Sequence, residues 1–350
     1  MTQMHRQSLT AYAAPLCETV VEAPEPKGSE VLVRIHRCGV CHSDLHMQDG
    51  YFLLGEGKQL DVRSGRTLPF TLGHEIAGVV ERAGPDAQAN VGAAVAVYPW
   101  IGCGQCAACK AGDENICAAP RHLGITVDGG FATHVLIPHE RYLIDYASLS
   151  ASYAGALMCS GLTAYAALKR LADRAGRAPM LLIGAGGVGL MGLALARAMY
   201  EGKIFVADID GKKREAALAA GATAVFDPAD ANARKEILKA SGGIYAAIDF
   251  VGSEKSLTFA TGVLAKGGKV VITGLLGGGW STAVAMFPLK AMTVEGTQTG
   301  TLAETRELID LVRAKNIPPP PMAERPLSAA QATLDDLRNG RIVGRVVLTI

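Results

Sequence analysis

The sequence predicts an α/β protein in which a β-rich domain precedes a doubly wound parallel sheet, and three observations point to this fold class. At 350 residues, the chain exceeds the size that one hydrophobic core usually serves, so two cores are expected. Residues 1 to about 160 carry short β-branched runs separated by Gly and Pro, which is typical of an antiparallel β-rich domain. From Met180 onward, strand-like and helix-like segments alternate, which indicates a parallel sheet with crossover helices.

The strands of the first half are expected where apolar and β-branched residues cluster: Glu30–His36, Ile76–Glu81, Ala94–Tyr98 and Ala132–Ile137. The last seven residues, Gly344–Ile350, are apolar enough to form a buried strand, and we expect this strand to return to the first domain.

In the second half, the expected strands are Met180–Ile183, Ile204–Asp208, Ala246–Val251, Lys269–Thr273 and Thr293–Gly296. The expected helices are Gly187–Tyr200, Lys212–Ala220 and Leu302–Lys315. The proline run Pro318–Pro321 then predicts a stiff connector.

Composition excludes several classes of protein. A net charge of +1 and the absence of a basic tract argue against nucleic-acid binding, which relies on clustered positive charge. The N-terminus lacks the apolar core of a signal peptide. The sequence also contains no run of about 18 apolar residues, which a membrane span would need. A cytoplasmic location is therefore expected, where cysteines serve as metal ligands or free thiols. Cys17 and Cys38 fit no ligand position and are expected to be ordinary thiols.

A glycine-rich turn predicts a dinucleotide site. Gly184, Gly186 and Gly189 form Gly-x-Gly-x-x-Gly between an apolar strand and an Ala/Leu-rich helix. In that context the first glycine allows the tight turn, the second lets the backbone approach a pyrophosphate, and the third lets the helix pack on the sheet.

A carboxylate after the next strand favours NAD over NADP. Asp208 lies 22 positions after Gly186, close to the spacing expected for the residue that binds the adenosine ribose. Asp208, together with Asp210, would repel the 2′-phosphate of NADP. The alternative is a glycine-rich turn followed by an ordinary surface aspartate.

Four cysteines within fifteen residues predict a structural zinc site. Cys103, Cys106, Cys109 and Cys117 are enough to close a tetrahedral thiolate shell with no position left for water. An iron–sulfur cluster is an alternative, but the last gap of seven residues and the lack of a following proline depart from the ferredoxin pattern. Disulfides are a second alternative, and they require an oxidising compartment.

Two further cysteines and a histidine could form a catalytic zinc shell. Cys41 begins the segment Cys41-His-Ser-Asp-Leu-His46, His74 lies in Gly73-His-Glu75, and Cys159 follows much later. Two thiolates and an imidazole leave one position open, as a catalytic zinc requires. Because no short motif joins the three residues, spacing alone does not establish this site.

Taken together, these motifs resemble those of the zinc-containing medium-chain alcohol dehydrogenases, in the family's order and nearly from end to end. The resemblance also includes Thr163, four residues after Cys159, and the Gly344-Arg345-Val-Val segment. It implies a GroES-like β-barrel catalytic domain over residues 1–160 and 299–350, with a structural zinc lobe at 100–118. A Rossmann coenzyme domain would cover residues 161–298.

The resemblance further implies an NAD-dependent enzyme with two Zn²⁺ per chain that interconverts alcohols with aldehydes or ketones. Cys41, His74 and Cys159 would bind the catalytic zinc, and Asp44 would orient His74. Glu75 would be either an alternative ligand or a carboxylate behind the ligands. Ser43 would accept the proton of the alcohol and pass it through the coenzyme ribose to His46, which would otherwise be an ordinary exposed residue. The implied coenzyme contacts are His42, Thr163, Gly184, Gly186, Gly187, Val188, Gly189, Asp208, Lys213, Val251 and Arg345.

The segment from residue 47 to 66 is longer than in many members of that family. Its place beside the zinc ligands predicts an apolar mouth of the substrate site, formed by Tyr51, Phe52 and Leu53 and suited to a bulky or aromatic alcohol. A surface loop with a self-packed hydrophobic tip is the alternative.

Other members of the superfamily fit less well. Polyol dehydrogenases usually carry Glu where this chain has Cys159, quinone reductases lack the zinc ligands, and cinnamyl-type enzymes prefer NADP. From a different class, a non-catalytic zinc and nucleotide-binding sensor or structural protein on the same fold stays open, because fold alone never proves activity. By analogy with the family, a homo-oligomer is expected, a tetramer rather than a dimer.

Overall fold

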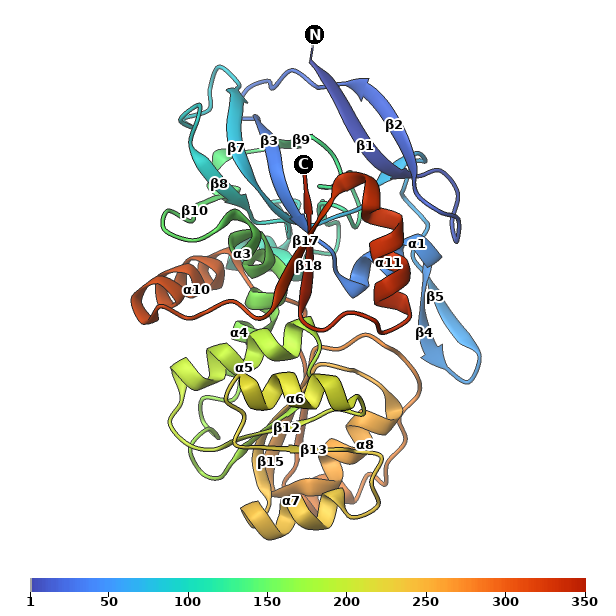
Figure 1. The fold of residues 1–350 in the computed structure, drawn as a ribbon, viewed down its shortest axis with the longest axis vertical. Helices are drawn as coiled ribbons and strands as arrows, with labels where there is room; N and C mark the ends of the chain where they lie inside the picture. Colours follow the sequence, from blue (N-terminus) through green and yellow to red (C-terminus); the bar gives the residue numbers. More distant parts are fainter. Residues whose placement is uncertain (1) are drawn as a thin grey trace.

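The computed structural model describes residues 2–350, and two large sheets dominate it, one above the other in Figure 1. The upper sheet is largely antiparallel, as the short apolar runs of the first half predicted. Its strands lie in the order β10 (Leu143–Asp145), β8 (Ala94–Val97), β7 (Glu75–Ala83), β3 (Val31–Gly39), β18 (Arg345–Thr349) and β17 (Met322–Pro326), with β9 (His134–Ile137) also on β3.

The C-terminal strand returns to this upper sheet, which confirms the sequence prediction. In the antiparallel pair of β18 with β3, Val347 lies opposite Gly39 and Thr349 lies opposite Arg37. The strand β17, which the sequence did not predict, runs parallel to β18. A smaller sheet beside it contains β2 (Cys17–Glu22), β1 (Gln3–Leu9) and β6 (Phe70–Thr71).

The lower sheet is parallel throughout, as the alternation of strands and helices predicted. Its order is β13 (Ala224–Phe226), β12 (Ile204–Ala207), β11 (Met180–Ile183), β14 (Ile244–Asp249), β15 (Leu264–Ile272) and β16 (Thr293–Gly296). The chain starts at the central strand β11, extends to one edge and then crosses to the other side. This reversal of strand order is the topological switch point of a doubly wound sheet.

Both faces of the parallel sheet are buried, since successive side chains of a strand point to opposite faces. In β11, Leu182 packs in the core that also contains Leu193 of α5, whereas Leu181 and Ile183 pack in a second core with Phe259 of α8. The helices of this half are α5 (Gly187–Met199), α6 (Gly211–Ala219), α7 (Ala233–Ser241), α8 (Glu254–Val263) and α9 (Met286–Lys290).

The chain passes between the two sheets twice. The first passage is helical and consists of α3 (Ala151–Ala156), a π-helical turn (Leu157–Gly161) and α4 (Leu162–Lys169). The second leads from β16 into α10 (Leu302–Lys315), which lies at the left between the sheets in Figure 1. The remaining helices are α1 (His42–Asp49), α2 (Ala107–Ala111) and α11 (Ala330–Arg338), with short 3₁₀ turns at Glu114–Ile116, Glu140–Tyr142 and Leu327–Ala329.

The long segment after α1 forms a two-stranded hairpin, β4 (Tyr51–Gly55) and β5 (Lys58–Asp61). Its tip reaches the loop that follows β15, where Gly278 N donates a hydrogen bond to Leu53 O at 3.3 Å. A Cβ on Gly55 would lie 2.1 Å from Gly279 N, so the two backbones meet closely. The hairpin therefore bridges the half of the molecule that contains the upper sheet and the half that contains the parallel sheet.

None of the helices formed by residues 2–350 is both long enough and apolar enough to cross a membrane.

Candidate functional site

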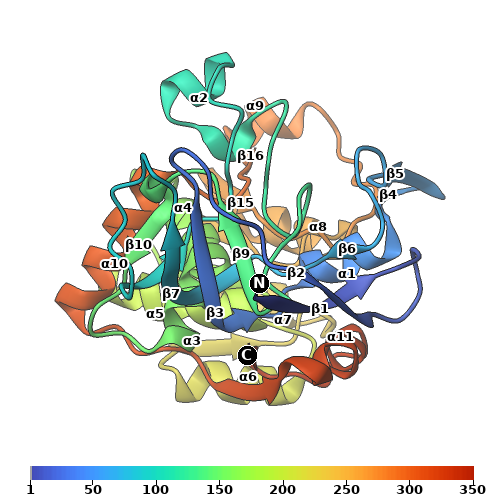
Figure 2. The same cartoon turned by 90° about the horizontal axis from the view of Figure 1, so that it is seen from above.

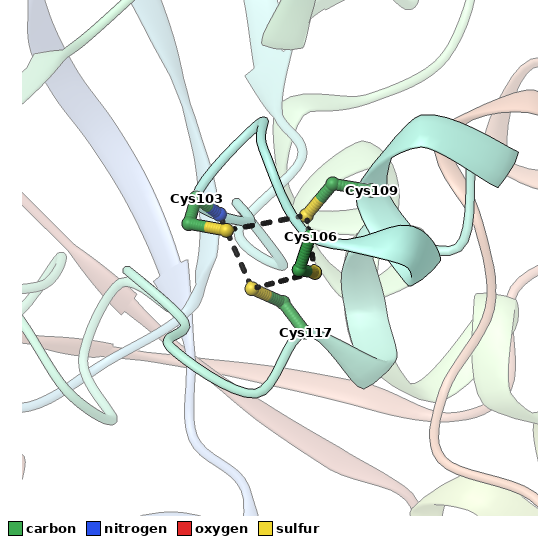
Figure 3. A group of neighbouring side chains, drawn as sticks. All are labelled: Cys103, Cys106, Cys109 and Cys117. Carbon is green, nitrogen blue, oxygen red and sulfur yellow. Dashed lines mark hydrogen bonds between the residues drawn. The ribbon is translucent and has the colours of Figure 1, made fainter.

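A lobe that projects from the upper half brings the four closely spaced cysteines together. Figure 2 shows its helix α2 standing out from the rest of the molecule, and Figure 3 shows the four thiols converging. Cys106 caps the N-terminus of α2, Cys109 lies within it, and Cys117 follows the 3₁₀ turn Glu114–Ile116. All four cysteines are free thiols, which argues against the disulfide alternative.

The spacing of these sulfurs fits zinc. The Sγ–Sγ distances are 3.5 Å for Cys106–Cys109, 3.8 Å for Cys106–Cys117 and 3.9 Å for Cys103–Cys109. Four sulfurs about 2.3 Å from one zinc, arranged as a tetrahedron, would be separated by about 3.8 Å. Backbone N–H groups also support the thiolate form, since Cys103 N lies 3.2 Å from Cys117 Sγ. The group is therefore suited to a closed, structural Zn²⁺ site.

A buried carboxylate attaches this lobe to the rest of the upper half. Glu114 accepts hydrogen bonds from Gly102 N at 3.0 Å and from Tyr142 Oη at 2.7 Å, and its other oxygen lies 2.9 Å from the Arg141 guanidinium. Charge-assisted bonds of this kind are stronger than neutral ones. The zinc lobe is thus fixed at its base, although most of its surface faces solvent.

The structure also brings together Cys41, His74 and Cys159, which are far apart in the sequence. Cys41 caps the N-terminus of α1 just beyond β3, His74 immediately precedes β7, and Cys159 lies in the π-helical turn between α3 and α4. Glu75 completes the group, and one ligand atom from each of the four residues lies within 4.8 Å of the others. All four side chains are buried.

Buried polar atoms without a hydrogen-bond partner indicate that this group binds a metal. Among residues 2–350, neither His74 Nε2 nor Glu75 Oε1 has a hydrogen-bond partner, although both atoms are buried. A buried polar group without a partner is costly. Two thiols, an imidazole and a carboxylate are also the donor types that zinc prefers. The residues present therefore fit a catalytic Zn²⁺, and they include Glu75 beside the three predicted ligands.

The carboxylate of Asp44 lies next to the ring of His74. Its carboxylate is fully buried, accepts hydrogen bonds from Cys41 N at 2.9 Å and from Gly73 N at 3.2 Å, and lies 3.3 Å from His74 Nδ1. Burial lowers the pKa of His74, but the Asp44 carboxylate raises it well above its usual value. Asp44 thus contacts the segments that carry two of the ligands.

Neighbouring groups set the protonation of the other side chains. A hydrogen bond from Cys159 holds the pKa of Cys41 well below its usual range, and the same bond together with burial raises the pKa of Cys159. Burial raises the pKa of Glu75 to about 7, although the Arg345 guanidinium contacts its carboxylate and opposes the shift. Because metal binding requires thiolates, zinc binding at this group would release protons.

The candidate relay residues lie on α1. Ser43 and His46 are three positions apart and therefore share one face of the helix. Ser43 Oγ lies 3.9 Å from Cys41 Sγ, so it borders the metal group. His46 is half-buried and packs against Phe52 of the hairpin, with ring centroids 4.5 Å apart. Burial lowers the pKa of His46, which keeps the ring largely neutral near pH 7.

The glycine-rich turn has the predicted form between β11 and α5. Gly184 has φ +91°, and a Cβ on Gly189 would lie 1.8 Å from Gly184 O, so the strand and helix meet closely there. A Cβ on Gly186 would meet nothing within 4 Å, which leaves open space in front of the N-terminus of α5. Gly187 contacts Arg345, and Val188 follows in the first turn of the helix. Such an N-terminus is suited to a pyrophosphate.

Further predicted coenzyme residues surround this turn. Asp208 follows β12, and its carboxylate accepts hydrogen bonds from Ala185 N at 2.7 Å and Asp210 N at 2.8 Å. Val251 packs against Gly184, and Thr163 is buried at the start of α4. The remaining three predicted residues are basic: His42 is the first residue of α1, Lys213 lies in α6, and Arg345 begins β18 next to Gly187.

One aromatic residue of the site was missed in the sequence. Trp100 is buried with its ring centroid 5.5 Å from that of His74, and its Nε1 donates to Met158 O at 3.0 Å. It therefore contacts one metal-group residue and fixes the backbone next to another, Cys159. Its position three residues before Cys103 is the only signal that could have drawn attention to it.

Comparison with known proteins agrees with this geometry. Residues 27–147 match the alcohol dehydrogenase GroES-like domain, and residues 187–314 match the zinc-binding dehydrogenase family. An NAD-dependent alcohol dehydrogenase of Sulfurisphaera tokodaii is 36% identical over 349 residues, and one of Saccharolobus solfataricus is 35% identical over 350, with 99% of each chain covered in both cases. The crystal structure of the alcohol dehydrogenase from Aeropyrum pernix superposes with a TM-score of 0.89 at 28% identity, covering 99% of this chain and all of the other.

The match extends over both sheets and includes both cysteine-containing groups. The two zinc sites, the parallel coenzyme-type sheet and the full-length similarity all lead to the same assignment. This chain belongs to the zinc-containing medium-chain alcohol dehydrogenase family of oxidoreductases.

Proposed function

We propose that the protein is an NAD-dependent alcohol dehydrogenase that reversibly converts primary or secondary alcohols into aldehydes or ketones. The observation that carries this proposal is the buried group of Cys41, His74, Glu75 and Cys159, which borders Ser43 and also lies next to Arg345 at the N-terminus of α5. A metal group and a dinucleotide turn that share one arginine are arranged for hydride transfer between adjacent ligands.

When bound, zinc makes the hydroxyl of an alcohol more acidic, and NAD accepts the hydride from its carbon. The chain's own residues would move the proton and hold the reactants. Ser43 would accept the hydroxyl proton, and His46, on the same helix face and largely neutral, would receive it near the surface. Arg345 and the N-terminus of α5 would bind the pyrophosphate, with His42 and Lys213 adding donors, while Thr163 and Val251 would border the coenzyme rings.

Asp208 supports the preference for NAD. Its carboxylate already receives two backbone hydrogen bonds, which fixes it at the end of β12, where the adenosine ribose of a dinucleotide lies. A carboxylate accepts hydrogen bonds from ribose hydroxyls and repels a 2′-phosphate.

The substrate class that we propose is bulky or aromatic alcohols. Phe52 packs on His46, and Trp100 packs on His74, so two aromatic rings border the reacting region. The contact of Leu53 with Gly278 places the hairpin at the junction of the two halves. Phe52→Ala should lower kcat/KM for benzyl alcohol relative to ethanol by about fivefold, the size of one aromatic contact. Lys58→Ala, at an exposed side chain of the same hairpin, is the matched control; an equal effect of both variants would contradict a role of Phe52 in the substrate site.

A steady-state screen of alcohols with NAD and NADP, together with a zinc count, tests the proposed function. We expect two zincs per chain and turnover with NAD. Cys159→Ala should lose one zinc and the activity together, whereas Cys38→Ala, at a buried cysteine outside both groups, should retain both. Zinc-loaded protein that reduces NAD with no alcohol of a broad panel would instead favour the non-catalytic sensor or structural protein.

We also propose the catalytic domain at residues 1–160 and 299–350, the coenzyme domain at 161–298, a cytoplasmic location and a homotetramer. Eight free cysteines support a reducing compartment. Exposed apolar side chains near the end of the parallel sheet, among them Leu275, Leu276 and Leu289, support an oligomer, because such patches commonly mark interfaces. Light scattering of the purified protein tests the tetramer.

A further inference from the structure

The second passage between the two sheets, residues 297–301, has an unusual backbone. Thr297 N donates a hydrogen bond to Ile272 O at 3.1 Å, which extends the edge of the parallel sheet beyond β16. Thr299 then adopts φ +48°, in the left-handed region. This conformation is unfavourable for a β-branched residue, so the surrounding structure must impose it.

Two side chains from the half that contains the upper sheet bind this crossover. Asn115 Nδ2 donates a hydrogen bond to Gln298 O at 2.7 Å, and Tyr98 Oη donates one to Gly300 O at 3.0 Å. The two carbonyls flank Thr299, and both donors are buried. The bonds therefore fix the backbone on either side of the residue with the unfavourable conformation.

Asn115 is itself held by the zinc lobe. It lies in the 3₁₀ turn Glu114–Ile116, two residues before Cys117, and its neighbour Glu114 is anchored to Gly102 and Tyr142. In the described chain, Asn115 Oδ1 has no hydrogen-bond partner, so the bond to Gln298 is the contact that orients this amide. The zinc lobe thus reaches the crossover through one side chain.

The crossover lies at the edge of the sheet where a coenzyme binds. In open α/β sheets, ligands bind outside the carboxyl ends of the strands. Residues 297–299 directly follow the carboxyl end of β16, at the same edge as Gly184 after β11 and Asp208 after β12. If the crossover relaxed, a coenzyme would bind only the fraction of molecules that retain the bound-state backbone, and its apparent affinity would fall by that fraction.

We propose that Asn115 is a positioning residue that keeps the crossover at Gln298–Gly300 in its coenzyme-binding conformation and so couples the structural zinc lobe to the coenzyme edge. This inference rests on the proposed binding of NAD at that edge. Asn115 acts through the backbone, with Tyr98 as a second, independent support.

The test compares Asn115→Ala and the equal-volume Asn115→Asp with the control Ile116→Ala, at the exposed neighbour in the same turn. Fluorescence titration should show an NADH dissociation constant three- to tenfold higher in both Asn115 variants, about the effect of one hydrogen bond. The KM for NAD should rise in parallel, whereas the zinc count should stay at two per chain and the melting temperature should fall by no more than about 10 °C, the effect of one lost buried hydrogen bond. Ile116→Ala should change none of these quantities. Tyr98→Phe should raise the dissociation constant in the same direction.

A double-mutant cycle addresses the backbone conformation directly. Thr299→Gly removes the penalty for positive φ, so Asn115→Ala should weaken NADH binding less in that background than in the wild-type background. Unchanged NADH affinity in the Asn115 variants would overturn the proposal, and so would a loss of zinc in proportion to the loss of affinity. Wild-type protein that binds no NADH would instead contradict the proposed function, so the two failures are distinguishable.

Discussion

The carboxylate behind His74 gives the sharpest test of the catalytic zinc site. Asp44→Asn keeps the size of the side chain but removes its charge and replaces one acceptor oxygen with an NH₂ donor. In the structure, one oxygen of Asp44 receives Cys41 N–H, and the other lies close to both Gly73 N and His74 Nδ1. Asparagine can satisfy only one of these two sides.

The magnitude follows from this arrangement. In either orientation of the asparagine amide, its NH₂ group faces at least one N–H donor. That donor then has no acceptor in a fully buried position. A hydrogen bond to a charged group contributes about 1.5–3 kcal/mol, and an unsatisfied buried group costs a similar amount. Loss of a carboxylate behind a metal-bound histidine typically weakens metal affinity about 10–100-fold, which agrees with that range.

Competition with a chromophoric chelator measures the effect. We expect Asp44→Asn to weaken one of the two zincs per chain by about 10–100-fold and to leave the zinc of the four-cysteine lobe unchanged. Asp49→Asn is the matched control, because Asp49 lies on the same helix but pairs with Arg338 at the surface. Wild-type zinc affinity in a folded Asp44→Asn protein would refute the idea that Asp44 orients a metal ligand.

Three further outcomes are expected. Asp208→Gly should weaken NAD binding about tenfold, because it removes the ribose acceptor, and should raise the ratio of NADP to NAD turnover in steady-state assays; an unchanged ratio would contradict the assigned role. Cys103→Ser should remove one zinc and lower the melting temperature, whereas Cys17→Ser, at an exposed thiol, should change neither. Burial lowers the pKa of His122 to about 4. Below about pH 6.5, the His122 imidazole therefore binds a proton in the unfolded state but not in the folded state. The free energy of unfolding should fall as the pH drops from about 6.5 to about 4. His122→Phe should flatten this slope in denaturation experiments.

Much of the fold and the local motifs could be predicted because short-range patterns determine them. The strand Met180–Ile183 and the helix Leu302–Lys315 lie where the hydrophobic pattern placed them. The cysteines of the zinc lobe are close in sequence, so their spacing alone constrains their geometry. The glycine turn likewise depends on contacts within a few residues.

The rest depends on contacts between distant segments, which no local pattern encodes. Cys41 and Cys159 are 118 positions apart in the chain and meet only because β3, which leads to Cys41, pairs with β7, against which the π-helical turn packs. No local pattern predicts that Glu75 and Arg345 form a buried pair, or that Asn115 reaches Gln298. Family resemblance predicted the zinc ligands where spacing could not.

The helical run around Cys159 limits where residues can be inserted or deleted without disturbing the site. A π-turn is an α-helix with one additional residue in a turn, and here it separates α3 from α4 within one helical run, Ala151–Lys169. The π-turn takes up this residue locally, but one residue inserted or deleted elsewhere in the run would rotate all that follows by about 100° and shift it by about 1.5 Å. Thr163 and the attached parallel sheet would then turn away from the metal group. Outside the π-turn, insertions and deletions along this run should therefore abolish activity.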